Sequence, residues 1–126
     1  MRPNTLFLVA GVLALAFGLG FLLVPAAVLP VYGVHPDAPT VLMSRFFGVA
    51  LVHLGLALTL IREVREPGVV RGLALSGVVG SMCGGLVALL GVIGNVTNAL
   101  GWSTVGIYGF LLLGYAACLR GQRSLA

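Results

Sequence analysis

Four long runs of apolar residues, separated by short polar segments, divide this chain of 126 residues. The runs cover about 5–24, 41–61, 69–93 and 101–119, and each is close to the ~20 residues that a helix needs to cross a bilayer. None shows the strict alternation of a half-buried strand, and a helix satisfies its own backbone hydrogen bonds in lipid. The pattern predicts one all-α domain over 1–126, an integral membrane four-helix bundle.

Composition agrees with a membrane location, since 60% of the residues are hydrophobic and 8% are charged. A soluble domain carries about 25% charged residues. The first run is also longer than the apolar core of a signal peptide, so we expect it to be retained as a helix. These observations exclude a soluble globular protein.

The basic residues are placed as membrane topology would place them. All seven are arginines, and the formal net charge is +4. Six of them flank the runs on one predicted side: Arg2, Arg62, Arg65, Arg71, Arg120 and Arg123. The positive-inside rule therefore predicts a multi-pass protein of a bacterial cytoplasmic (inner) membrane with both termini in the cytoplasm. So few, scattered cations do not predict a nucleic-acid partner.

Candidate chemistry is sparse. Cys83 and Cys118 would differ in depth by about 17 Å along their helices, too far for a disulfide, and no cluster of metal ligands occurs in the sequence. No nucleophile–base set, paired carboxylates or phosphate-binding loop is present. We therefore expect no catalytic residues, no metal, no required cofactor and no enzymatic activity.

Small residues recur at helical spacing within the runs. Such residues let helix backbones approach closely in a membrane. The positions predicted to pack helices together are Gly11 and Gly18, Gly48 and Gly55, and Gly77, Gly80, Ser81, Gly84 and Gly91.

Two ionisable residues lie inside the second run. Its bulky residues Phe47, Leu51, Leu54, Leu58 and Ile61 fall within an arc of about 80° on a helix, which predicts a lipid-facing stripe. Arg45 would then point inward with Val49, Val52, Leu56 and Thr59, and His53 would lie on the flank. Arg45 pairs with Asp37, or it binds an anionic or carbonyl group, or it snorkels to the interface.

His53 has three interpretations. A neutral imidazole bonded to Ser81, Tyr108 or a helix carbonyl is the structural one, and single-histidine ligation of a haem or chlorophyll pigment is the second. A proton relay is the third and is the least favoured, because no Asp or Glu occurs in any of the four runs to share the proton. The sequence also permits a small outer-leaflet pocket of Arg45, His53, Tyr108, Asp37 and Trp102.

The layout resembles small bacterial proteins with four membrane helices to which no activity is attached. The residues that carry the resemblance are Leu29-Pro30-Val31-Tyr32-Gly33, Arg45-Phe46-Phe47-Gly48 and Gly101-Trp102. Small multidrug transporters are similar in length and helix number, but the first run here lacks the acidic residue on which their proton exchange depends.

Two functional hypotheses follow. In the first, the chain is a non-catalytic accessory or structural subunit of a membrane complex or homo-oligomer, whose partners are the lipid bilayer and other membrane subunits or itself. In the second, it binds or transports a small amphiphile, a quinone, lipid or pigment, at the pocket near Arg45 and His53.

Overall fold

The structure, a computed structural model, describes residues 2–123, and no strand occurs among them. The helices are α1 (Pro3–Leu23), α2 (Pro25–Val31), α3 (Ala38–Ile61), α4 (Pro67–Ile93) and α5 (Gly101–Arg123). All except α2 are long and apolar enough to cross a membrane. The predicted all-helical architecture with four membrane-length apolar helices is therefore confirmed, while α2 is an additional short helix in the first connecting segment.

Proline and acidic residues define where the helices begin. Pro3, Pro25 and Pro67 are the first residues of α1, α2 and α4, a position where a missing N–H costs nothing. The Asp37 carboxylate accepts a hydrogen bond from the Thr40 N–H at 2.8 Å and so caps α3. Glu66 caps α4 in the same way, and such caps satisfy backbone donors that a helix start leaves unpaired.

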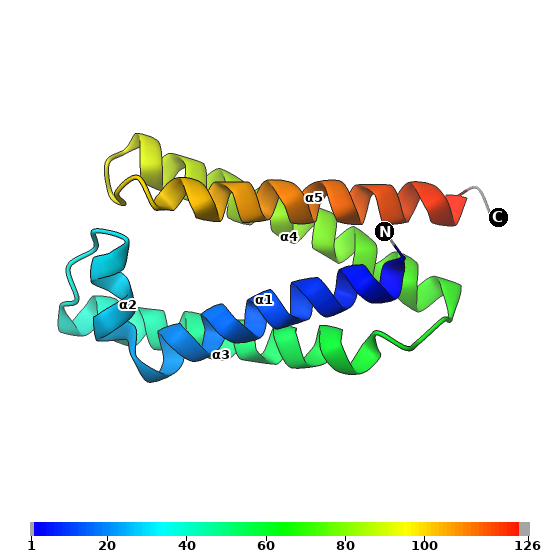
Figure 1. Ribbon diagram of the computed structural model, residues 1–126, viewed down its shortest axis with the longest axis horizontal. Helices are drawn as coiled ribbons and strands as arrows, with labels where there is room; N and C mark the ends of the chain where they lie inside the picture. Colours follow the sequence, from blue (N-terminus) through cyan, green and yellow to red (C-terminus); the bar gives the residue numbers. More distant parts are fainter. Residues whose placement is uncertain (1, 124–126) are drawn as a thin grey trace.

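The four long helices form two antiparallel pairs, α1 with α3 and α4 with α5 (Figure 1). The pairs meet at one end of the molecule and separate toward the other. We call the meeting end the arginine-rich end, because α1 and α4 begin there and α3 and α5 end there, with Arg2, Arg62, Arg65, Arg71 and Arg120.

The buried core lies toward the arginine-rich end. It joins both pairs and consists of Leu6, Phe7, Ala10, Leu58, Val70, Ala74, Tyr115 and Cys118. Leu6 also fills the space beside Gly114, where an added Cβ would lie 2.7 Å from its side chain. The arrangement is thus more open than a bundle with one core along its whole length.

The opposite end is closed by Asn98, in the turn between α4 and α5. Its side-chain amide donates to the Val31 carbonyl at 3.0 Å, and its backbone N–H donates to the Tyr32 carbonyl at 2.8 Å. Gly33 follows with a φ of +76°, and an added Cβ there would be 3.2 Å from the Asn98 side chain. We call this contact between α2 and the α4–α5 turn the Asn98 clasp.

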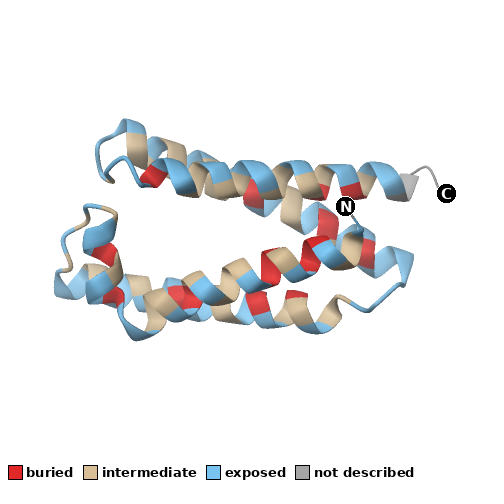
Figure 2. Ribbon diagram, viewed as in Figure 1, coloured by how far each residue is buried: buried red, intermediate tan, exposed pale blue. Residues whose placement is uncertain are grey.

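Most of the surface of both pairs is exposed or only partly buried (Figure 2). Large apolar side chains are exposed along α3 and α4, and fewer of them along α5. A monomeric soluble protein rarely exposes apolar patches of this extent. These faces therefore suit contact with lipid or with another membrane protein.

Candidate functional site

Glycines bring the backbones of α1 and α3 into direct contact. A Cβ on Gly48 would lie 2.8 Å from the carbonyl oxygen of Gly18, and one on Gly55 would lie 2.8 Å from that of Gly11. The Thr59 hydroxyl donates to the Gly55 carbonyl at 2.7 Å. No larger residue fits at these four positions without moving a helix.

In the other pair, tyrosine rings cover the glycines. A Cβ on Gly77 would lie 2.5 Å from the Tyr115 ring, and one on Gly84 would overlap the Tyr108 ring. Tyr108 and Tyr115 are one heptad apart, as are the two glycines. Each ring therefore occupies the notch that a missing side chain leaves on α4.

Two expected packing positions are corrected within this chain. A Cβ on Gly80 would meet nothing within 4 Å, and one on Gly91 would meet the Thr97 hydroxyl of the following turn at 3.9 Å. Gly80 lies off the face that the tyrosines cover, and Gly91 lies beyond them near the end of α4. Ser81, by contrast, is buried.

The expected orientation of α3 is wrong in part: Phe47 and Leu54 are exposed as expected, and Val52 and Thr59 face α1 as expected, but other positions differ. Leu58, expected to face lipid, is 4% exposed in the core, and the Cβ of Leu51 is 3.0 Å from the Cβ position of Gly18. Val49 and Leu56, expected to face inward, are 53% and 47% exposed. The reason is that Gly48 and Gly55, the small residues, form the face that meets α1, since only they allow the backbones to touch.

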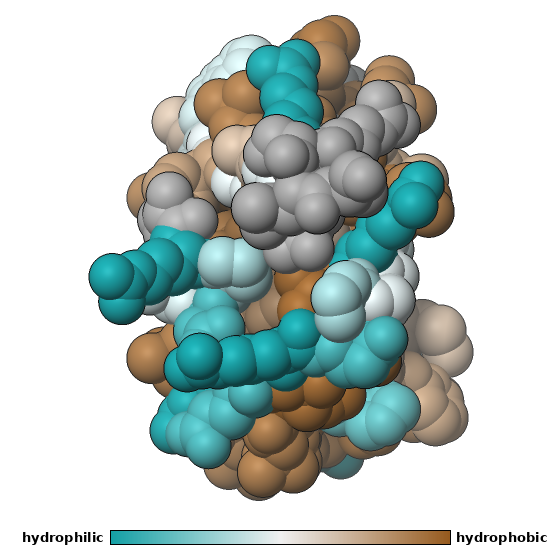
Figure 3. Space-filling view, turned by 90° about the vertical axis from the view of Figure 1, so that its right-hand side faces the viewer, coloured by the Kyte–Doolittle hydropathy of each residue, from teal (hydrophilic) through white to brown (hydrophobic). Residues whose placement is uncertain are grey.

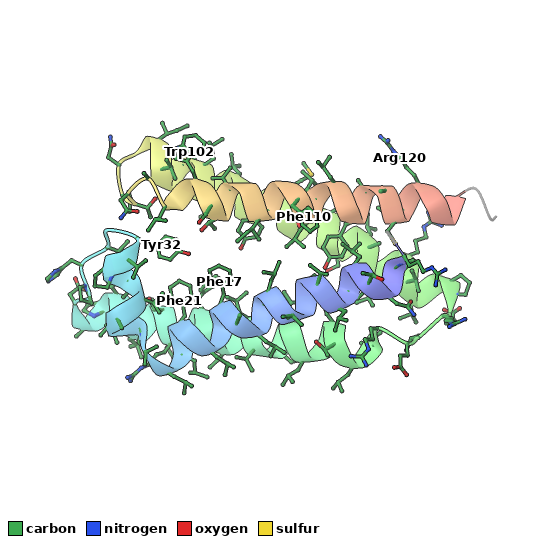
Figure 4. All side chains as sticks on the ribbon, viewed as in Figure 1. Phe17, Phe21, Tyr32, Trp102, Phe110 and Arg120 are labelled. Atoms are coloured by element: carbon green, nitrogen blue, oxygen red, sulfur yellow. The ribbon has the colours of Figure 1, made fainter. Side chains whose placement is uncertain are left out.

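The structure does not bring the five candidate ligand-binding residues together. Tyr108 is packed between α4 and α5, whereas Arg45 and His53 are exposed on α3 in the other pair. Trp102 is 53% exposed and projects from α5 away from the α1–α3 pair (Figure 4). A shared pocket of these residues is therefore not formed within one chain.

Asp37 acts as a helix cap. Its hydrogen bonds from Thr40 hold the pKa of its carboxyl below the usual value, with a smaller contribution from the charge of His35. Among residues 2–121, the one ion pair joins Arg62 and Glu63 at 3.5 Å. The Asp37–Arg45 pair expected from sequence is thus absent from this part of the chain.

A cavity of about 510 Å³ lies beside Tyr108 on the α4–α5 surface. Its walls include Met82, Leu86, Leu89 and Leu112, and no other member of the predicted pocket lines it. Its lining is mainly apolar and its mouth is open, so a lipid chain in the bilayer would fill it without specific polar contacts.

The side chains of Arg45 and His53 have no hydrogen bond or ion pair to any residue that the structure describes. Both lie well inside the span of α3 and both are exposed. Ionisable residues in membrane spans almost always face protein or a water-filled cavity rather than lipid. No contact among the described residues therefore accounts for these two exposed ionisable residues within α3.

The exposed face of α3 also carries a heptad pattern. Its members alternate in spacings of four and three residues and are all exposed: Leu42, Phe46, Val49, His53, Leu56 and Leu60. We call these six residues the α3 outer seam. The sequence analysis did not identify this seam, because it predicted the faces of the helix from its bulkiest residues. The spacing of four and three residues was the signal that could have identified it.

Among the described residues, no three His, Cys, Asp or Glu side chains gather as metal ligands would. Comparison with protein-family models, curated proteins and solved structures finds no match to this chain. The four membrane-length apolar helices are consistent with the resemblance to small four-helix membrane proteins.

Proposed function

We propose that this protein is a non-catalytic structural membrane protein that works as a homo-oligomer, in which two copies pack through the α3 outer seam. The observation that carries the proposal is His53, an ionisable residue at the centre of an otherwise apolar heptad face that no part of the described residues covers. A second copy would cover it and would remove it from lipid.

The heptad spacing explains how two such faces fit. Apolar residues repeating every 3.5 positions form knobs that enter holes on a facing helix. Two copies inserted with the same orientation would meet about a two-fold axis along the membrane normal, so each seam residue faces its own counterpart. His53 would then lie opposite His53 of the second copy.

Histidine suits that central position. A neutral imidazole has one donor and one acceptor nitrogen, so two of them can hydrogen-bond to each other. A single polar residue in an apolar seam also fixes the register of the two helices. Arg45 would flank the seam, about 10 Å from the start of α3, where its long side chain can extend to the membrane surface.

The first test is cysteine cross-linking in membranes, in a background with Cys83→Ala and Cys118→Ala. Val49→Cys places a thiol in the α3 outer seam, and Val12→Cys places one on α1 at the same 53% exposure of the parent residue. We expect oxidation to give a covalent dimer for Val49→Cys alone. Equal cross-linking of both variants, or none, would refute the proposed interface.

The second test measures affinity by energy transfer between labelled copies in lipid bilayers. The double variant Phe46→Ala with Leu56→Ala shortens the seam, and Phe110→Ala with Leu113→Ala is the matched control on exposed α5. The seam variant should dissociate about ten times more readily, a loss of about 1.4 kcal/mol, while the control keeps its affinity. A stronger effect of the α5 variant would place the interface there instead.

A further inference from the structure

A cavity of about 370 Å³ lies at the arginine-rich end, between the start of α1 and the segment that links α3 to α4. Arg2, Pro3 and Asn4 form one wall, and Val64, Arg65 and Val70 form the other. Its size is within the range of small-ligand pockets. Two cations from segments far apart in sequence thus line one cavity.

The acidic residues nearby do not neutralise these two cations. Glu63 pairs with Arg62 at 3.5 Å, and Glu66 accepts a hydrogen bond from the Val69 N–H at 3.1 Å. Arg2 and Arg65 have no ion pair among the described residues. The space-filling view of this end shows hydrophilic side chains interspersed with apolar ones (Figure 3). The cavity therefore carries net positive charge.

The remaining walls fit an anion attached to an apolar body. The start of α1 presents the positive end of the helix dipole and one backbone N–H without a partner in the helix, that of Asn4, because Pro3 has no N–H and those of Thr5 and Leu6 donate to the Arg2 carbonyl. Pro3, Val64 and the buried Val70 supply apolar surface next to the charge. A free polar anion would need no such surface.

The position of the cavity is that of a lipid headgroup. Arg2 precedes the apolar span of α1, and Arg65 precedes that of α4. Both guanidinium groups therefore belong at the boundary between membrane and water, where lipid phosphates lie. Guanidinium groups match phosphate oxygens through paired, charge-assisted hydrogen bonds.

We propose that the cavity between Arg2 and Arg65 binds the phosphate group of an anionic phospholipid. The bound lipid would join the start of α1 to the α3–α4 link, across the place where the two helix pairs meet. This site is distinct from the α3 outer seam and does not depend on it.

The test compares lipid retention by native mass spectrometry of the full chain released from bilayers of phosphatidylcholine with or without phosphatidylglycerol. Arg2→Gln with Arg65→Gln removes the cavity cations. Arg71→Gln with Arg120→Gln removes the same charge outside the cavity lining and is the matched control. Retention of phosphatidylglycerol should fall about tenfold in the first variant, as for loss of a charge-assisted hydrogen bond, and stay unchanged in the control.

Three outcomes would overturn the assignment. Equal losses in both double variants would mean a diffuse field of positive charge instead of a site. Equal retention of phosphatidylglycerol by the parent and by Arg2→Gln with Arg65→Gln would remove the cavity from lipid binding. Arginine-dependent binding of inorganic phosphate in pure phosphatidylcholine would assign the cavity to a soluble phosphate. Cross-linking of Val49→Cys in the same bilayers reports separately on the homo-oligomer.

Discussion

Single glycines in this protein differ in what faces them, and this determines what a substitution would do. Gly84 lies under the Tyr108 ring, whereas a Cβ on Gly109 would meet nothing within 4 Å. Both are glycines within membrane-length helices, so composition alone does not separate them. The contacts around each glycine distinguish the two positions.

We predict that Gly84→Ala lowers the free energy of unfolding by about 1–3 kcal/mol, the usual cost of overpacking a fitted contact. Gly109→Ala should be neutral or stabilising, because alanine favours the helix by up to about 1 kcal/mol and nothing obstructs its methyl group. Reversible unfolding in mixed detergent micelles measures both values.

The assignment to Tyr108 can be checked by a double-mutant cycle. If the added methyl group acts through the ring, Gly84→Ala should cost less in a Tyr108→Ala background, because the obstructing atoms are gone. Additive effects of the two substitutions would show that the cost arises elsewhere.

Among the connections between helices, the Asn98 clasp ties α2 to the α4–α5 turn. The clasp joins the two helix pairs at the end where they otherwise separate (Figure 1). Asn98 also accepts a hydrogen bond from the Leu100 N–H at 3.0 Å through its side-chain oxygen. One side chain therefore both shapes the turn and holds α2.

Asn98→Asp should separate these two roles. Aspartate keeps the oxygen that accepts from Leu100 but cannot donate to the Val31 carbonyl, so the clasp loses one hydrogen bond worth about 0.5–1.5 kcal/mol. We expect faster hydrogen–deuterium exchange of the amides from Tyr32 to Val34, with the core of α4 unchanged. Unchanged exchange in the α2 segment would mean that the clasp does not hold it.

The sequence predicted the long helices because twenty-residue apolar runs leave the backbone no alternative in lipid. It predicted the orientation of α3 only in part, because bulky residues such as Leu58 do not all face lipid. The glycine face of α3 packs against α1, because backbone contact at Gly18 and Gly48 requires two small residues opposite each other. Only the fold shows which residues lie opposite each other. The same limit hid Arg65 beside Arg2, which come together only when α4 returns to the start of α1.

At the scale of the whole molecule, the fold places the start of α1, the α3–α4 link and the end of α5 at one end (Figure 1). The α2 segment and the α4–α5 turn lie at the other. Arginine occurs in the first set of segments and in neither member of the second. By the positive-inside rule, we predict that the arginine-rich end faces the cytoplasm in every copy.

Impermeant maleimide labelling of intact bacterial cells tests this orientation in the background lacking Cys83 and Cys118. Ala99→Cys, in the exposed α4–α5 turn, should react from outside, and Val64→Cys, in the α3–α4 link, should react only after the membrane is permeabilised. The reverse pattern would mean that the arginine-rich end faces outward.

Labelling of both positions from outside would mean that copies insert in two orientations, and the α3 outer seams would then also meet antiparallel. In that arrangement every seam residue would face a different residue of the second copy, and Val49 would face His53 if the two seams were centred on each other, so a single cysteine at position 49 would no longer face its own counterpart. The labelling result therefore decides which pairs of seam positions a cross-linking survey must find.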